Sequence, residues 1–337
     1  MRVAVAMSGG VDSSVAAALL SGQGHEVVGI TLRQVAGEAE SHGGCCSLSA
    51  VEDARRVASS LGIPHYVWNL EREFGELVVD PFIAGYMGGE TPNPCLLCNQ
   101  RVRFDLMLAR VLALGFDAMA TGHYARILDG ALHMAVDPDK DQSYVLYRLG
   151  RVQLAQLLFP LGGMRKAEVR EHAVEFGLPV AGKRDSQEIC FVPLGRTRDW
   201  LGARSAVRSG PLVTVGGREV GSHAGASLYT VGQRTGFVSL REPGPWYVLQ
   251  VDADANRVVV GRREELAVTR VRLRDASFSG PQPVRGEARL RYRAPLIPAV
   301  YQEGWLELEE PFHGAAPGQA AVLYAGTRVL GGGTISL

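Results

Sequence analysis

The stretch Met7-Ser8-Gly9-Gly10-Val11-Asp12-Ser13-Ser14 joins an apolar run that begins at Arg2 to a helix-like run, Val15–Gly22. Two adjacent glycines allow tight or left-handed backbone and the close approach of a ligand. Successive N–H groups at the start of a helix attract anions, and the helix dipole adds to this. A lone Gly-Gly would favour a simple capped turn, but the whole string after a strand predicts a phosphate-binding loop.

The polar side chains of this loop refine the prediction. The hydroxyls of Ser8, Ser13 and Ser14 are potential donors to a ligand. Asp12 is suited either to capping the helix or to holding a magnesium ion through oxygen. Since no lysine follows, the loop differs from the G-x-x-x-x-G-K-[ST] type.

Composition sets broader limits. The 337 residues suffice for two or three domains, 46% hydrophobic content indicates a globular protein, and the formal net charge is zero. No signal peptide or membrane span is evident, so we expect a cytoplasmic protein. Arg262–Arg293 nevertheless contains nine arginines and four acidic residues. The five cysteines favour metal or catalytic use over disulfides in a reducing compartment.

Strand-like and helix-like segments alternate in the first half of the chain. This order predicts an α/β fold of the Rossmann-like type, with a parallel sheet covered on both faces. Ligands of such sheets bind beyond the carboxyl ends of the strands, where both the loop and the sequence TGHY fall. The expected strands are 2–7, 26–32, 64–69 and one through DAMATGHYA, and the expected helices are 12–20, 49–61, 103–114 and a broken stretch over 152–176.

The second half is richer in Gly, Val and Arg and contains short strands between turns. The sequence DADAN between two alternating runs predicts a hairpin. We predict three domains: a nucleotide-binding domain over 1–195, a small mixed domain over 196–265, and a β-barrel over 266–337.

The cysteines allow several kinds of chemistry. Cys95-x-x-Cys98 is half of a typical zinc site, but a second such pair is lacking and the adjacent Cys45 and Cys46 are poorly placed for chelation. A redox dithiol is a second interpretation. Cys95, Cys98 and Cys190 as ligands of an iron–sulfur cluster are a third. For Cys190 alone, a small buried hydrophobe is the alternative, and the roles of Cys45 and Cys46 stay open.

A specific resemblance emerges from the order of the motifs. Several motifs follow one another in a fixed order along nearly the whole chain. They are MSGGVDSS, TPNPxxxCN, ATGHYAR, KDQSYVLYRL, DSxxICF, TVGQRxG, PGQxAVxY and LGGG. Together they resemble the tRNA-specific 2-thiouridylases of the PP-loop ATP pyrophosphatase superfamily, which place sulfur at position 2 of the wobble uridine. The resemblance implies a PP-loop domain, a small central domain and a C-terminal β-barrel.

The resemblance also implies roles for individual residues. Cys98 matches the nucleophilic cysteine, Cys190 the persulfide carrier and Asp12 the catalytic aspartate of the loop. The residues expected to bind ATP with Mg²⁺ are Ala6, Met7, Ser8, Gly9, Gly10, Val11, Asp12, Ser13, Leu32 and Gly122. The residues expected to contact tRNA are Asn93, Pro94, Cys95, His123, Lys140, Asp141, Gln142, Arg291, Tyr292 and Gln319.

One position departs from the commoner pattern. Many members have Asp where this chain has Cys95, and N-P-C here resembles a branch that holds a [4Fe-4S] cluster through three cysteines. Cysteine favours soft metals, so we expect a cluster on Cys95, Cys98 and Cys190 rather than a Cys190 persulfide alone. Either carrier implies a sulfur donor upstream, a cysteine desulfurase or a relay protein.

Purely structural interpretations also exist for several of these residues. His123 could be a core or capping histidine, and the segment from Lys140 could be a solvated loop. The arginines over 270–293 alternate with apolar residues, which suits phosphate contacts but equally a solvated sheet face. Segments 71–91 and 182–191 are expected to be loops that become ordered on tRNA.

The expected reaction is adenylation of the C2 oxygen of a flipped-out uridine, followed by displacement of AMP by sulfur. Two rivals fit the loop. One is another PP-loop enzyme, such as a different tRNA thiolase or an amidating synthetase. The other is a non-catalytic nucleotide or RNA sensor. No DNA or membrane partner is expected.

Overall fold

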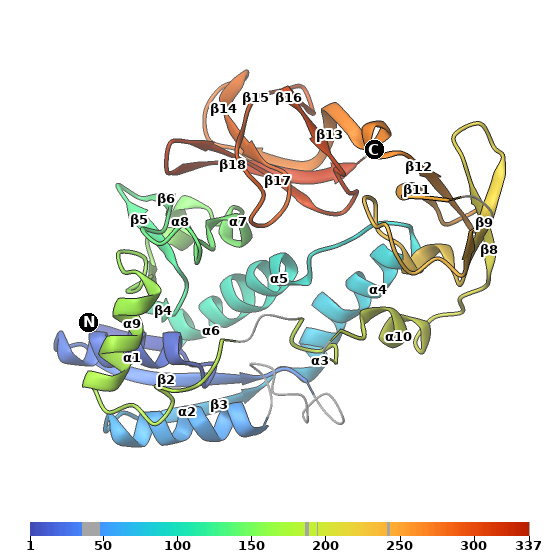
Figure 1. The fold of residues 1–337 in the computed structure, drawn as a ribbon. Coiled ribbons are helices and arrows are strands. Elements are labelled where there is room, and N and C mark those ends of the chain that lie inside the picture. The colour runs from blue at the N-terminus through green and yellow to red at the C-terminus, as the bar shows by residue number, and fades with distance from the viewer. Residues whose placement is uncertain (36–47, 186–188, 194, 241–242, 337) are drawn as a thin grey trace. The chain divides into compact units, whose positions relative to one another are not determined.

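The N-terminal region forms a five-stranded sheet of order β3-β2-β1-β4-β7, in which all four neighbouring pairs are parallel. The computed structural model describes residues 1–35, 48–185, 189–193, 195–240 and 243–336. The predicted parallel sheet is therefore confirmed (Figure 1). Its strands are β1 (Arg2–Ala6), β2 (Glu26–Arg33), β3 (His65–Asn69), β4 (Ala118–Thr121) and β7 (Leu157–Leu158).

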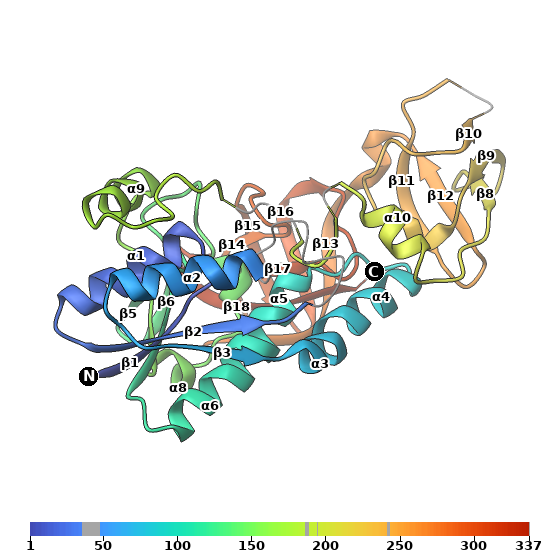
Figure 2. The same ribbon diagram turned by 90° about the horizontal axis from the view of Figure 1, so that it is seen from below.

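Helices cover both faces of this sheet, as the buried pattern of β1 and β2 requires. Figure 2 shows α1 and α2 on one side of the strands and α6 on the other. The expected helices near 12–20 and 49–61 are confirmed. The bounds are α1 (Val11–Gly22), α2 (Leu48–Ser60), α3 (Glu71–Phe74), α6 (Leu108–Ala113), α7 (Ser143–Leu146), α8 (Arg151–Leu154) and α9 (Lys166–Glu175).

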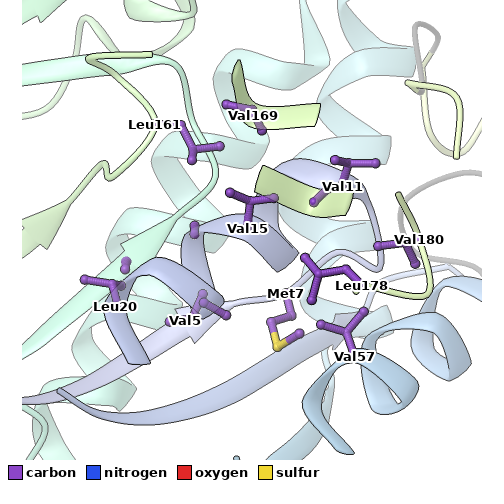
Figure 3. Close-up of a cluster of buried hydrophobic side chains, with 14 of the residues drawn as sticks. Val5, Met7, Val11, Val15, Leu20, Val57, Leu161, Val169, Leu178 and Val180 are labelled. Atoms are coloured by element: carbon purple, nitrogen blue, oxygen red, sulfur yellow. The ribbon is translucent and has the colours of Figure 1, made fainter. Parts of the chain in front are cut away.

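An apolar cluster between the sheet and its helices fixes the start of α1 (Figure 3). Val11 and Val15 of α1 lie with Val169 of α9, and Met7 lies near Val57 of α2. All five side chains are at most 4% exposed. Burial of each such side chain contributes about 1.5–3 kcal/mol. The backbone of the glycine loop, between Met7 and Val11, is thus held at both ends.

Two predicted segments are corrected. The helix expected to begin near Arg103 begins at Pro94 and runs through α5 (Pro94–Leu97) and the π-helix η3 (Cys98–Met107) into α6. A proline favours the first helical position because its missing N–H has no partner there. The expected loop over 71–91 is largely helical, with α3 followed by η2 (Gly75–Val79) and α4 (Asp80–Met87).

The stretch 152–176 is broken, as expected, near Phe159. It also contains β7, which pairs with β4 at the edge of the sheet. Two residues are too few for a period-2 pattern, so the sequence offered no signal for this strand.

The central region is a second sheet of order β10-β9-β8-β12-β11. Leu212, Tyr229, Val248 and Val258 form its buried core. The hairpin predicted at DADAN is confirmed, since β11 and β12 are antiparallel neighbours. The elements are α10 (Thr197–Gly202), β8 (Gly210–Val213), β9 (Glu219–His223), β10 (Ser239–Leu240), β11 (Tyr247–Asp252) and β12 (Arg257–Gly261).

The C-terminal region is a closed antiparallel barrel. Closure follows because β13 pairs with β16 on one side and β18 on the other. Its strands are β13 (Ala267–Phe278), β14 (Val284–Arg289), β15 (Ile297–Gln302), β16 (Trp305–His313), β17 (Ala320–Ala325) and β18 (Arg328–Ser336). A further hairpin, β5 (Ala125–Leu128) with β6 (Ala131–Met134), pairs at His133 with Arg328.

Contacts divide the chain into two compact units. The first contains 1–78, 95–195 and 327–329, and the second contains 79–94, 196–326 and 330–337. The segment before Cys95 thus belongs with the barrel and the central sheet. The domain boundaries after 195 and 265 stay predictions. Among the described residues, no helix is both long and apolar enough to span a membrane.

Candidate active site

The glycine loop is shaped by close packing. Gly9 has φ +69°, and a Cβ atom there would lie 2.1 Å from the carbonyl oxygen of Ala50 in α2. Both the left-handed backbone and the missing space require glycine at this position. The loop amides therefore sit directly against a second helix, and this fixes the direction in which they point.

The loop hydroxyls hold the loop itself. Ser13 Oγ accepts from the Ser8 amide at 3.1 Å and donates to the Gly10 carbonyl at 3.2 Å. Ser14 Oγ donates to the same carbonyl at 2.8 Å, and both serines are at most 4% exposed. The hydroxyls of Ser13 and Ser14, expected as potential donors to a ligand, donate to the Gly10 carbonyl in this structure. ATP contacts from them stay predictions.

The end of β4 reaches the loop, as the positions of TGHY and SGGVDSS at strand ends predicted. A Cβ atom on Gly122 would lie 2.7 Å from the amide nitrogen of Ser13. Leu32, near the end of β2, is 8% exposed, and the Met7 amide donates to Ile30. The loop, Leu32 and Gly122 thus cluster at the carboxyl ends of three adjacent strands, where such sheets bind ligands.

Asp12 has two partners that sequence reasoning missed. Lys166 Nζ, from the start of α9, donates to Asp12 Oδ1 at 2.6 Å, and Tyr124 OH donates to the same oxygen at 2.8 Å. The side chain of Lys166 is only 11% exposed. Burial and the Asp12 charge raise the pKa of Tyr124. Tyr124 belongs to the sequence TGHY, so its place near the loop could have been predicted. No local sequence pattern indicates that Lys166 contacts Asp12.

Asp185 collects three cations. Lys140, Lys166 and Arg170 contact its carboxylate at 2.8, 2.9 and 2.9 Å. Burial opposes ionisation, but the hydrogen bonds from Lys140 and Lys166 outweigh it and lower the pKa of Asp185 to about 2. Lys166 thus bridges the loop aspartate to the segment that leads toward Cys190.

His123 is a core residue in this structure. It is 5% exposed, its ring contacts those of Phe104 and Phe159, and Nδ1 lies 2.7 Å from Thr121 Oγ1. Burial, with a smaller effect of Arg103, lowers the pKa of His123 to about 3, so the ring is neutral. The tRNA contact of His123 stays a prediction, and the core interpretation describes the observed state.

The segment Lys140-Asp141-Gln142 makes internal contacts. Asp141 is 5% exposed and accepts from the amides of Ala135 and Ser143. Gln142 Oε1 accepts from the Tyr124 amide at 2.9 Å. These bonds shape the backbone next to the loop tyrosine. Contact of the segment with tRNA stays a prediction.

The cysteines occupy different environments. Cys95 is exposed in α5, while Cys98, at the first position of η3, is half-buried and accepts from Gln34 Nε2 at 3.8 Å. Cys190 is half-buried, and its neighbour Phe191 packs edge-to-face on Phe74 of α3. Cys45 and Cys46 lie outside the described residues.

The expected iron–sulfur ligand set is not gathered. Within the described ranges, no three or more His, Cys, Asp or Glu side chains lie close enough together to hold a metal ion. Cys95, Cys98 and Cys190 are therefore not gathered in this structure, and the cluster on them stays a prediction. The C-x-x-C spacing places two thiols one helical turn apart, but it cannot bring in a third from 92 residues away.

The segment that precedes the cysteine helix is held by the barrel. Gln319 Nε2 donates to the Thr91 carbonyl at 2.5 Å, and Arg274 of β13 makes a two-pronged ion pair with Glu90 at 2.5 and 2.6 Å. The Thr91 amide donates to Pro317. Gln319, predicted to contact tRNA, thus positions the residues next to Asn93 and Pro94.

The exposed arginines of β13 alternate with buried apolar residues, as predicted. Arg270, however, lies over the ring of Trp305 and pairs with Glu307. Two neighbouring residues here are predicted to contact tRNA. Arg291 is exposed, and the ring of Tyr292 lies under the guanidinium of Arg293. An exposed arginine near an aromatic ring suits nucleic acid, and these contacts stay predictions.

Comparisons with known proteins agree with this architecture. Models of the tRNA methyl transferase HUP domain, the tRNA methyl transferase PRC-barrel domain and the aminomethyltransferase beta-barrel domain match residues 1–194, 198–262 and 263–335. A tRNA-specific 2-thiouridylase MnmA of Acidothermus cellulolyticus is 49% identical, with 100% of this chain and 98% of the relative covered. The chain belongs to the tRNA-specific 2-thiouridylase family.

Other members are similarly close. The 2-thiouridylases of Geobacter metallireducens and Moorella thermoacetica are both 46% identical, over 99% and 98% of this chain and 96% and 98% of their own lengths. The predicted fold class of a parallel-sheet domain, a small central domain and a β-barrel is confirmed.

Gly9→Ala is expected to abolish detectable ATP binding, because the new methyl group collides with the Ala50 carbonyl and displaces the loop amides. Gly24→Ala is the matched control, since Gly24 has φ +81° and open space around its Cβ position. The control is expected to lose only about 1 kcal/mol of stability. Calorimetric titration with ATP measures the first effect. Equal ATP affinities in the two variants would contradict the packing argument.

Asp185→Asn is expected to lower the free energy of unfolding by about 2–4 kcal/mol at pH 7, because three cations lose their shared carboxylate. The pKa of Asp185 is lowered on folding, so its stabilisation is present above pH 4 and is lost as the pH falls toward 2. Urea unfolding followed by circular dichroism should show the wild-type and variant stabilities converging below pH 4. A difference that is constant from pH 7 to 3 would refute the assignment.

Proposed function

We propose that this protein is an ATP-dependent enzyme that makes 2-thiouridine at the wobble position of tRNA. The observation that carries the proposal is the full-length similarity to 2-thiouridylases, at 46–49% identity through all three domains. The shape of the glycine loop supports a nucleotide, and the cysteines within the first compact unit support sulfur chemistry. The similarity alone favours tRNA as the substrate.

The first step is adenylation. The C2 oxygen of the uridine attacks the α-phosphorus of ATP, the bond to the bridging oxygen breaks, and pyrophosphate leaves. The amides of Gly9 and Gly10 and the start of α1 stabilise negative charge on the phosphates. Because these groups are fixed by the contact of Gly9 with Ala50, little reorganisation accompanies the reaction.

Asp12 is the residue suited to hold Mg²⁺. Its side chain is 32% exposed, and carboxylate oxygens are ligands that Mg²⁺ accepts. The ion would supply positive charge to the phosphates when bound. Lys166 and Tyr124 orient this carboxylate through their hydrogen bonds to Oδ1.

The second step transfers sulfur. In the proposed scheme the terminal sulfur of a Cys190 persulfide attacks C2, and AMP leaves with the former C2 oxygen. The thiolate of Cys98 then attacks the Cys190 sulfur, which leaves sulfur on the base and joins the two cysteines in a disulfide. A thiol reductant restores both thiols, and a cysteine desulfurase or relay protein reloads Cys190.

The substrate base is assigned to the segment Asn93-Pro94-Cys95. The chain passes from the second compact unit to the first between Pro94 and Cys95. Asn93 follows the stretch that Gln319 and Arg274 hold to the barrel. The barrel would thus serve the reaction by fixing the base-binding segment, in addition to any contact of Arg291 or Tyr292 with tRNA.

The test is mass spectrometry of tRNA nucleosides after incubation with ATP and a persulfide donor. We expect 2-thiouridine, AMP and pyrophosphate in equal amounts, and release of AMP only when tRNA is present. An amidating synthetase would not need tRNA, and a sensor would bind ATP without releasing pyrophosphate. Failure to thiolate any tRNA would overturn the proposal.

Cysteine variants separate the sulfur carriers. Cys98→Ser and Cys190→Ser are expected to stop thiolation while leaving ATP binding intact, since neither thiol lies in the loop. Cys95→Ala is expected to retain thiolation with iron-free enzyme. Loss of activity in Cys95→Ala, together with iron and sulfide in anaerobically purified wild type, would instead establish the cluster.

Arg274→Ala is expected to lower kcat/KM for tRNA by about tenfold, because charge-assisted bonds of this kind contribute about 1.5–3 kcal/mol. ATP affinity should not change. Arg272→Ala, two residues away on the same exposed face of β13, is the control and should behave as wild type. Equal kcat/KM for Arg274→Ala and Arg272→Ala would remove the proposed role of the barrel.

A further inference from the structure

The glycine loop contains no lysine, but a lysine from a distant part of the chain contacts its backbone. Lys183 Nζ donates to the carbonyl oxygen of Gly9 at 3.0 Å and to Asp53 Oδ2 at 2.6 Å. Lys183 is 174 positions from Gly9, so no loop motif in the sequence could reveal this contact. We propose that Lys183 supplies the phosphates of ATP with the positive charge that the loop lysine supplies in G-x-x-x-x-G-K-[ST] sites. This inference rests on the proposed function.

The bonding of Lys183 leaves room for a ligand. An ammonium group has three N–H donors, and the two contacts recorded for Lys183 in the described chain use two of them. Its side chain is 34% exposed, whereas that of Lys166 is 11% exposed and joined to both Asp12 and Asp185. Lys183 is therefore the lysine that an incoming oxygen can reach, and Lys166 is the one that holds the loop aspartate.

Asp53 holds Lys183 in place beside the loop. Burial opposes its ionisation, but Lys183 and Arg56 outweigh this and lower the pKa of the Asp53 carboxyl. Asp53 also pairs with Arg56 on α2. Since two cations share one carboxylate, positive charge remains available beside the loop.

The charged side chains around the loop also have a positive net charge. Three carboxylates near the loop are paired with five cations, which are Arg56, Lys140, Lys166, Arg170 and Lys183 facing Asp12, Asp53 and Asp185. The balance is +2, and it is +1 when Asp137, which accepts from the Lys166 amide, is included. The whole chain has a formal charge of zero, so this local excess favours a polyanion at the loop.

The alternative role for Lys183 is purely structural, tying α2 to the loop through Asp53 and Gly9. A structural tie would affect every ligand of the loop region in the same way. A phosphate contact would affect only ligands with phosphates. Comparison of ATP with adenosine therefore separates the two roles.

The experiment is calorimetric titration of the full-length protein with ATP and with adenosine. For Lys183→Ala, ATP affinity is expected to fall by about tenfold to a hundredfold, the range for a charged hydrogen bond. Adenosine affinity should change less than twofold. Lys183→Arg, which keeps the charge, should recover part of the ATP affinity.

Arg56→Ala is the matched control, because it removes one positive charge from the same carboxylate and its side chain is 66% exposed. Its ATP affinity should fall several times less than that of Lys183→Ala, because the described ion pair of Arg56 is with Asp53, whereas Lys183 also contacts the loop at Gly9. Equal losses for ATP and adenosine in Lys183→Ala, or no loss, would overturn the inference while leaving the proposed function intact. Wild-type protein that does not bind ATP would overturn both.

Discussion

The contact of Lys166 with two carboxylates is the interaction on which the candidate site depends. Its ammonium joins Asp12 at the start of α1 to Asp185, which leads toward Cys190. A lysine this deeply buried is tolerated because two carboxylates surround it, and breaking such a network leaves an uncompensated charge. The energetic penalty holds the loop aspartate, the start of α9 and Asp185 together. Preorganisation of this kind lowers the cost of assembling the site when ATP binds.

Periodicity and turn chemistry predicted the fold well. β1, β2 and β3 are short apolar runs, α1 and α2 have clear starts, and Gly9 marked the loop. The helix expected from Arg103 begins earlier, at Pro94, because proline suits the first turn of a helix. β7 was missed because its place is set by pairing with β4 rather than by a pattern of its own.

The candidate site was less predictable than the fold, for a physical reason. Lys166, Lys183 and Asp185 act through ion pairs with partners between 15 and 154 positions away, and a pair of opposite charges has no sequence period. The same limit explains why the sequence could not show whether the three cysteines of the expected iron–sulfur cluster lie close together. Cys95 and Cys98 are related by one helical turn, which sequence shows, whereas their distance to Cys190 depends on how η3 and α3 pack. The described side chains do not bring the three thiols together.

The different environments of Cys95 and Cys98 suit the two cysteines to different roles. Cys98 lies half-buried beside Gln34, at the end of the strand that carries Leu32, so it shares a sheet edge with the glycine loop. Cys95, by contrast, is exposed on the preceding turn. A thiol that must attack a persulfide needs a fixed position and protection from water, whereas an exposed thiol offers neither. Cys95 is therefore better suited to the proposed base-binding segment, of which it is part, than to the sulfur transfer proposed for Cys98 and Cys190.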